Sequence, residues 1–242
     1  MNQTINFKKT LSKIGVLNFL VRLKYVISKK GIISGIYNFL IIDAVSHYRN
    51  KKFDKVNNIH TSQILEVNKL GITSNQIKDL NRYQPVSIRH LQIICDFIIQ
   101  KLDKDFEIFL DVGTGLGRPV FFASQKLEFI KKFVGIDLSK KLISSANNNL
   151  INFNKINKNT SKFIHFLNQD ALKYNFVERK HIIFLFNPFS VKILELFLIK
   201  NLSLIKKTKS IIVYVNEPKS NFLNKNFKLI FEDDYLDLKI FK

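Results

Sequence analysis

The chain has 242 residues, of which 46% are hydrophobic, and this length suits one catalytic domain with an extension. Its single cysteine, Cys95, excludes an internal disulfide framework and is typical of a protein in a reducing cytoplasm. The five histidines are scattered along the chain, so the sequence predicts no metal site.

The formal net charge of +20 permits binding to nucleic acid or to an anionic membrane surface. However, the basic residues are 33 Lys and only 6 Arg, beside 25 Asn. Phosphate contacts favour arginine because its guanidinium can donate two parallel hydrogen bonds. The bias toward lysine is therefore more typical of codon usage, and no motif specifically supports a nucleic-acid partner.

Residues 1–60 are predicted to form a basic helical extension. They contain eleven Lys and Arg but only two acidic residues, Asp43 and Asp54. Its apolar runs are too short or too interrupted for a signal peptide or a membrane-spanning helix. The extension could pack on the catalytic domain, cover a substrate pocket, or place residues 1–50 on anionic lipid. The expected location is the cytoplasm, with association at the cytoplasmic face of a membrane as the alternative.

Two further parts follow this extension. Residues 50–62 are predicted to be a polar connector, and residues 61–105 a helical segment with a helix after Pro85. Residues 106–242 alternate short apolar runs with amphipathic segments, and the chain ends in two alternating runs around Asp233 and Asp234. This pattern predicts an α/β fold, a doubly wound, mostly parallel seven-stranded sheet of Rossmann-like type with an antiparallel C-terminal hairpin.

A glycine-rich stretch, DVGTGLG, joins the first predicted strand of this sheet to the next helix. Its glycines are Gly113, Gly115 and Gly117, and Arg118 stands where a G-x-G-x-x-G dinucleotide fingerprint requires a further glycine. Glycines at this edge allow a close approach between the backbone and a ligand. Arg118 could begin the helix, contact a cofactor carboxylate or be solvated.

Three polar residues follow the next strands, at the same edge of the sheet. Asp137 could accept hydrogen bonds from both hydroxyls of a ribose, and Asp170 could accept one from an adenine amino group. Asn187 ends the fourth strand, directly before Pro188. Together with the glycines, these strand ends predict a nucleoside-binding edge.

The series DVGTGLGRP, VGIDLS, NQDALKY and FNPF resembles the motifs of class I S-adenosylmethionine-dependent methyltransferases. The resemblance implies that S-adenosyl-L-methionine is the cofactor and that Asp111 and the three glycines hold its methionine part and the edge of its ribose. The implied cofactor-binding residues are Asp111, Gly113, Thr114, Gly115, Gly117, Asp137, Asp170 and Asn187. In amino-methylating relatives a similar N/D-P-P-Y/F motif holds the target nitrogen, but this chain lacks the second proline.

A narrower resemblance links the chain to a poorly characterised bacterial group of these enzymes with Y-x-P, D-x-G-S/T-G-x-G-R and F-N-P-F motifs. Here FDKVNNIHTS begins at Phe53, YQP at Tyr83 and NPF at Asn187. The resemblance implies that residues 61–105 cover the cofactor, and it makes Asn187 and Tyr83 the candidate catalytic residues on the acceptor side.

The resulting expectation is a methyltransferase that acts by in-line displacement on a nitrogen or oxygen acceptor. The acceptor could be a small molecule, an envelope sugar or lipid, or a macromolecule. One rival is a nucleic-acid-binding or membrane-surface-binding protein with a degenerate core, and a weaker rival is a nicotinamide-dependent oxidoreductase.

Overall fold

The computed structural model describes residues 43–72, 78–158, 162–218 and 220–242. By its internal contacts the chain divides into a first unit, Met1–Lys52, and a second unit, Phe53–Lys242. Most of the predicted basic extension, including most of residues 1–50, lies outside the described residues. The predicted domain boundaries near residues 60 and 105 stay predictions.

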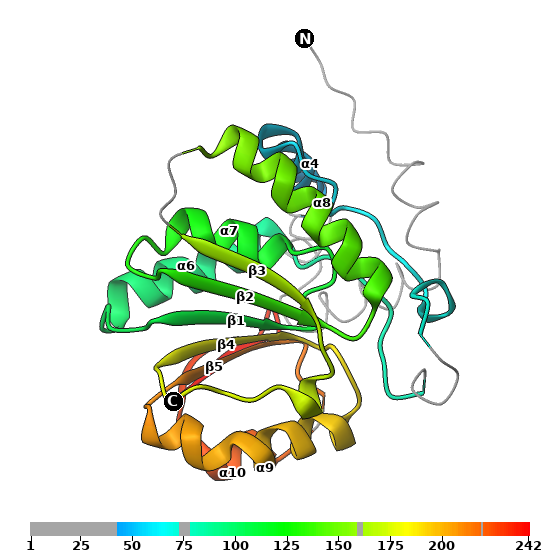
Figure 1. Cartoon of the computed structure of the whole chain (residues 1–242). Helices are drawn as coiled ribbons and strands as arrows, with labels where there is room; N and C mark the ends of the chain where they lie inside the picture. Colours follow the sequence, from blue (N-terminus) through cyan, green and yellow to red (C-terminus); the bar gives the residue numbers. More distant parts are fainter. Residues whose placement is uncertain (1–42, 73–77, 159–161, 219) are drawn as a thin grey trace, which may run out of the picture. The chain divides into compact units, whose positions relative to one another are not determined.

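The second unit is built on a seven-stranded sheet in the order β3-β2-β1-β4-β5-β7-β6 (Figure 1). The first five strands pair in parallel, and β7 pairs antiparallel with both β5 and β6. The strands are β1 (Ile108–Val112), β2 (Lys132–Asp137), β3 (Phe163–Asn168), β4 (His181–Phe186), β5 (Ile211–Val215), β6 (Leu229–Asp233) and β7 (Leu238–Phe241).

Helices cover both faces of this sheet (Figure 1). Helices α6, α7 and α8 pack on one face, and α9 and α10 pack on the other. The helices are α4 (Asp43–Asn57), α6 (Ile88–Lys101), α7 (Arg118–Lys126), α8 (Lys140–Ile156), α9 (Val191–Lys207) and α10 (Phe222–Asn226), with short 3₁₀ turns η2 (Val67–Lys69) and η3 (Ala171–Lys173).

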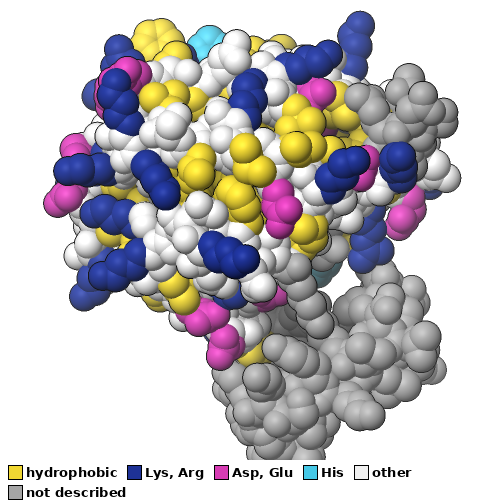
Figure 2. Space-filling view, turned by 90° about the horizontal axis from the view of Figure 1, so that it is seen from below, with side chains coloured by type: hydrophobic (Ala, Val, Ile, Leu, Met, Phe, Trp, Pro, Cys, Tyr) yellow, Lys and Arg dark blue, Asp and Glu magenta, His cyan; other side chains and the backbone are white. Residues whose placement is uncertain are grey.

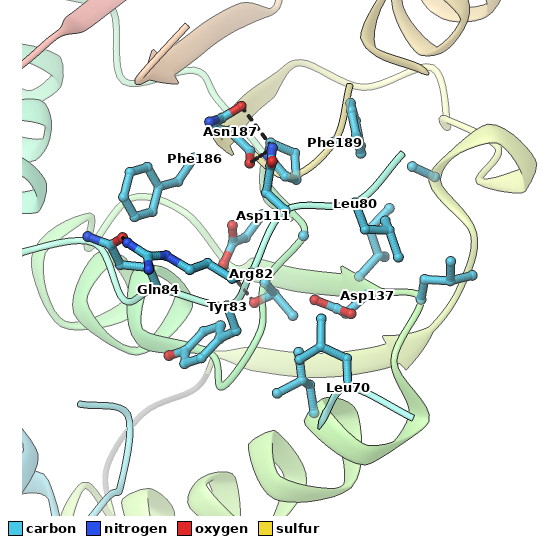
Figure 3. A pocket seen from close by; sticks show the side chains of 18 of the residues that line it. Leu70, Leu80, Arg82, Tyr83, Gln84, Asp111, Asp137, Phe186, Asn187 and Phe189 are labelled. Atoms are coloured by element: carbon cyan, nitrogen blue, oxygen red, sulfur yellow. Dashed lines mark hydrogen bonds between the residues drawn. The ribbon is translucent and has the colours of Figure 1, made fainter. Parts of the chain in front are cut away.

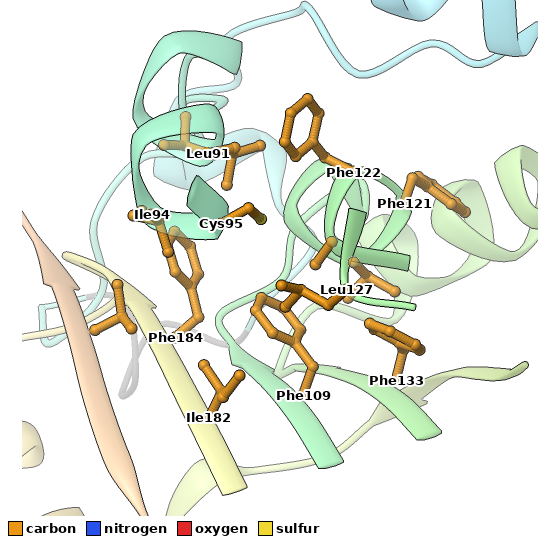
Figure 4. Packing of buried hydrophobic residues seen from close by; sticks show 14 of the residues in the cluster. Leu91, Ile94, Cys95, Phe109, Phe121, Phe122, Leu127, Phe133, Ile182 and Phe184 are labelled. Carbon is orange, nitrogen blue, oxygen red and sulfur yellow. The ribbon is translucent and has the colours of Figure 1, made fainter. Parts of the chain in front are cut away.

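The central strands are mainly apolar because both of their faces are buried, and Asp111 in β1 and His181 in β4 are their buried polar exceptions. On the face of α6 and α7, the rings of Phe109 and Phe184 lie 6.1 Å apart and nearly parallel. Leu91, Ile94 and Cys95 of α6 complete this layer (Figure 4). The core thus fixes β1 and β4 side by side, and their carboxyl ends form the edge where the site lies.

The predicted fold class is confirmed by this sheet, including its antiparallel C-terminal strands. One local prediction was wrong. Residues 50–57 belong to α4 and are not a connector, and Asp54 within them is buried. Within the described parts of the chain, no helix has the length and apolar character needed to cross a membrane.

Candidate functional site

A cavity of about 230 Å³ opens at the carboxyl ends of β1, β2 and β4 (Figure 3). The described segment 79–86, called here the cover segment, contributes one side of it. Of the predicted site residues, the cavity is lined by Tyr83, Asp111, Gly113, Thr114, Asp137, Asp170 and Asn187. Gly115 and Gly117 belong to the same loop but are not part of the cavity wall.

The glycine loop leaves β1 in an unusual backbone conformation. Gly113, Gly115 and Gly117 all have positive φ, at 78°, 55° and 89°. The loop is tied to β2, since the amides of Gly113 and Thr114 both donate to the carbonyl of Ile136, at 2.9 and 3.0 Å. Side chains other than glycine are strained at such φ values, so the loop conformation itself requires these glycines.

Two of the glycines are also closely approached by the rest of the protein. A Cβ atom at Gly113 would lie 2.4 Å from Cβ of Pro188, and one at Gly115 would lie 2.1 Å from Cε2 of Tyr83. Both distances are far shorter than a van der Waals contact. The absence of a side chain at Gly113 and Gly115 therefore allows Pro188 and Tyr83 to pack directly against the backbone of the loop.

Asp111 is a buried carboxyl group at the end of β1 and is 1% exposed. Thr114 Oγ1 donates to its Oδ2 at 2.6 Å. Burial raises the pKa of Asp111 to about 7, the Thr114 hydrogen bond opposes this, and the nearby Asp137 charge adds to it. A cavity-lining carboxyl group in this state would be stabilised in its ionised form by a positively charged ligand.

Asp137 is held by main-chain donors on both sides. Its Oδ2 accepts from the Gly115 amide at 2.9 Å, and its Oδ1 accepts from the Ser139 amide at 2.8 Å. Burial raises the pKa of Asp137 to about 6 despite these two bonds. The carboxylate is thus fixed between the glycine loop and the start of α8, and each of its oxygens keeps a further acceptor position.

Asp170 lies where predicted, after β3, and it also has a local role. Its Oδ1 accepts from the Leu172 amide at 2.9 Å and so caps η3. The same side chain therefore caps η3 and lines the cavity.

Asn187 has a φ of 41°, which is rare for a residue other than glycine. In this conformation its carbonyl oxygen and its Oδ1 face the same donor. Asn81 Nδ2 donates to the carbonyl oxygen at 2.9 Å and to Oδ1 at 3.1 Å (Figure 3). Ser190 Oγ donates to Asp79 Oδ1 at 2.9 Å, and the Asn81 main-chain amide donates to the carbonyl oxygen of Pro188. The cover segment therefore runs along residues 187–189, called here the N-P-F loop.

Tyr83 covers the glycine loop with its ring, and its hydroxyl donates to the carbonyl oxygen of Thr61 at 2.9 Å. In Figure 3 this hydroxyl points away from Asp137. Burial raises the pKa of Tyr83, so the hydroxyl stays protonated at neutral pH. A catalytic role for Tyr83 stays a prediction.

Arg118 is 1% exposed, so the reading of this residue as solvated was wrong. It begins α7, as one alternative held, and its guanidinium contacts Asp54, Thr61 and Ser62. These three partners are not among the site residues predicted from the sequence. All three lie in the stretch FDKVNNIHTS, and their contacts with Arg118 give this stretch a physical role.

Among the described residues, no group of three or more His, Cys, Asp or Glu side chains is arranged to hold a metal ion.

The chain matches no protein-family model and no curated protein sequence. Solved structures do resemble it. The small RNA methyltransferase HEN1 aligns with a TM-score of 0.50 at 14% identity, over 64% of this chain and 25% of that protein. The magnesium protoporphyrin IX methyltransferase of Synechocystis, solved with bound S-adenosylmethionine, aligns with a TM-score of 0.46 at 13% identity, over 81% of this chain and 93% of that protein.

At these identities the likeness concerns the fold. The sheet of this chain, with its antiparallel β7 between β5 and β6, is of Rossmann-like type, and the solved structures that resemble it are methyltransferases. The chain thus has the fold of class I methyltransferases.

Proposed function

We propose that the protein is a class I S-adenosylmethionine-dependent methyltransferase of the bacterial group that its motifs resemble. The observation that carries the proposal is the position of Asp137. Its carboxylate is held between the glycine loop and α8 by two main-chain donors, at the carboxyl edge where folds of this type bind nucleosides. Asp170 and the buried Asp111 line the same cavity.

The residues present fit this cofactor. Asp137 would accept from the ribose hydroxyls, and Asp170 would accept from the adenine amino group. The raised pKa of Asp111 is what a buried carboxyl group shows when no cation accompanies it. The sulfonium and ammonium groups of S-adenosylmethionine would supply that positive charge.

S-adenosylmethionine, when bound, supplies a methyl group on an already activated sulfonium. The protein therefore needs mainly to align the acceptor with the methyl group and to keep water out, and alignment of this kind is worth roughly 7–11 kcal/mol. The cover segment and the N-P-F loop close the cavity on the acceptor side. No step in this scheme requires a metal ion.

On the acceptor side we propose that the two oxygens of Asn187 hold the acceptor. At present they share one planar NH₂ group, that of Asn81. Two convergent acceptor oxygens suit a nitrogen that carries two hydrogens better than a hydroxyl, which can donate only once. This favours an amino or amide nitrogen as acceptor, which would take the place of the Asn81 side chain.

The first test is calorimetric titration with S-adenosylmethionine, S-adenosylhomocysteine and NAD, on the wild type and on Asp137→Ala. We expect the first two ligands to bind the wild type and to lose at least about tenfold in affinity when the charge-assisted acceptor is removed.

Asp233→Ala is the matched control, because Asp233 Oδ1 also accepts from two main-chain amides, in the turn between β6 and β7. It should bind like the wild type. Binding of NAD alone would overturn the proposal in favour of an oxidoreductase. Binding of none of the three ligands would favour a nucleic-acid-binding or membrane-binding protein with a degenerate core.

A further inference from the structure

The most extensive buried polar cluster that the proposed mechanism does not use surrounds Arg118. Its guanidinium donates from Nε to Thr61 Oγ1 at 2.7 Å and from Nη2 to Ser62 Oγ at 2.6 Å. Asp54 lies on the other side of these hydroxyls, with its carboxylate 3.4 Å from Nη2. Arg118 is 1% exposed and Thr61 is fully buried.

The two hydroxyls relay the interaction between the opposite charges. Thr61 Oγ1 donates to Asp54 Oδ1 at 2.6 Å, and Ser62 Oγ donates to Asp54 Oδ2 at 2.7 Å, while both accept from Arg118. The Thr61 amide adds a third bond to the carboxylate at 2.9 Å. The turn at residues 61–62 is thereby held on both sides by charged groups, and charge-assisted hydrogen bonds are the strong ones.

This turn carries the contact that holds Tyr83. The carbonyl oxygen of Thr61 accepts the Tyr83 hydroxyl at 2.9 Å, and Leu65 pairs with Tyr83 through two main-chain bonds of 2.9 and 3.0 Å. The Tyr83 ring lies directly on Gly115, where it leaves no room for a Cβ atom. Arg118 is thus connected through the turn at residues 61–62 to the ring that covers the glycine loop.

Arg118 also holds the cover segment itself. Its Nη1 donates to the carbonyl oxygen of Val86 at 3.0 Å, just beyond Tyr83 in the chain. The guanidinium therefore binds residues 61–62 and the end of the cover segment at once. A lysine could not do so, because it lacks the planar fork of donors.

We propose that Asp54 and Arg118 are positioning residues of the cofactor cavity: they hold the Tyr83 ring over Gly115, whose amide binds Asp137, and so order the glycine loop beside the carboxylate that would hold the ribose. The inference rests on the proposed function for the identity of the cofactor. It gives the stretch FDKVNNIHTS and the arginine after the third loop glycine a common physical role.

The test uses the full chain and two readouts. The first is hydrogen–deuterium exchange of residues 113–118 without ligand. The second is affinity for S-adenosylmethionine compared with 5′-methylthioadenosine, which lacks the amino-acid end. In Asp54→Asn we expect faster exchange and an affinity loss of about tenfold for both ligands, since both carry the ribose that Asp137 would hold.

Thr61→Val is the milder variant in case Asp54→Asn does not fold, because it removes one relaying hydroxyl but keeps the carbonyl oxygen that binds Tyr83. It should change both readouts in the same direction. Asn57→Ala is the matched control on the same helix. Asn57 is 2% exposed and binds Gln125 at 2.6 Å, but it does not contact Arg118 or Asp54.

Wild-type exchange and wild-type affinity in both variants would overturn the inference, as would a loss confined to S-adenosylmethionine, because 5′-methylthioadenosine carries the same ribose. Failure of the wild type to bind S-adenosylmethionine would overturn the proposed function, and the exchange of residues 113–118 would then decide the positioning role alone.

Discussion

Arg118 stands directly after the third glycine of the loop, and its sequence context alone allowed it to be solvated, ligand-binding or structural. Burial excludes the solvated reading, because an arginine with 1% exposure has to find partners within the protein, although Arg118 also lines the cavity. Those partners lie 32 to 64 residues earlier in the chain. The FDKVNNIHTS stretch contains three of them, but nothing in the sequence near Arg118 pairs them with it.

A second prediction at the residue scale concerns Asn81, whose side-chain amide binds the two Asn187 oxygens that are proposed to hold the acceptor. In Asn81→Ala the two Asn187 oxygens lose their internal donor, so an amino acceptor no longer has to compete for them. A neutral hydrogen bond is worth about 0.5–1.5 kcal/mol, so methyl transfer to amino compounds should rise roughly three- to tenfold. Release of S-adenosylhomocysteine, measured over a panel of amino, amide and hydroxyl compounds, checks this prediction.

Two further variants sharpen this experiment. Asn187→Gly removes Oδ1 but tolerates the φ of 41°, and it should lower transfer to amino acceptors. Asn226→Ala, which removes a similar amide-to-carbonyl bond on α10, should change nothing. An equal gain for hydroxyl compounds in Asn81→Ala would contradict the assignment of a nitrogen acceptor.

At the scale of the elements, the position of a strand in the sheet determines how much of it is buried. Strands β1 and β5 are buried along their whole length and β4 up to its half-buried last residue, Phe186, whereas β3 is the edge strand next to β2 and is largely exposed. Phe163 at its start is 66% exposed and Leu167 is 41% exposed. An apolar edge strand with unpaired main-chain groups is a site for self-association.

Phe163→Lys should therefore reduce concentration-dependent association, because a lysine on an edge strand opposes pairing with another strand. Light scattering over a concentration series measures the effect, and affinity for S-adenosylmethionine should not change. Ile151→Lys on α8 adds the same charge at another exposed apolar residue and serves as the control. If both variants reduced association equally, added charge and not the edge strand would be the cause.

At the scale of the whole molecule, the net charge of +20 is not gathered in one place on the surface that Figure 2 shows. There, Lys and Arg side chains are dispersed among hydrophobic and acidic ones over the described residues. Such an arrangement keeps the protein apart from its copies without forming a continuous basic groove on this face. Partners that use residues 1–50 stay a prediction.

The two buried carboxyl groups predict how binding depends on pH. The pKa of Asp111 is raised from 3.8 to about 7, so the protonated form stabilises the ligand-free fold below pH 4, and this contribution is lost as the pH rises through 7. A cationic ligand favours the ionised form. Affinity for S-adenosylmethionine should therefore increase with pH, roughly tenfold between pH 5.5 and 8.

Thermal unfolding with and without S-adenosylmethionine at both pH values measures this linkage. The ligand-induced rise in melting temperature should be larger at pH 8, since stabilisation follows the ratio of ligand concentration to Kd. Asp111→Asn cannot ionise, so most of the pH dependence should vanish, leaving the smaller part from Asp137, whose pKa is raised to about 6. A wild-type dependence in Asp111→Asn would show that another group is responsible.

The sequence by itself determined the order of strands and helices and the polar residues at the strand ends. Apolar periodicity and turn residues act over a few positions, so they can be recognised locally. The carboxyl ends of neighbouring parallel strands meet at one edge, and for this reason the sequence alone assigns Asp137, Asp170 and Asn187 to a common edge of the sheet, where all three line the cavity.

Only the tertiary structure decided what surrounds these strand ends. Asn81 binds Asn187 from 106 residues away, and Arg118 binds Thr61 from 57 residues away. The direction of the Tyr83 hydroxyl was equally undetermined, because it depends on a carbonyl group 22 residues earlier. Contacts between residues so far apart in the sequence form only when the whole chain packs. A single polar residue is not part of a periodic pattern, so the sequence does not indicate which distant residue it will contact.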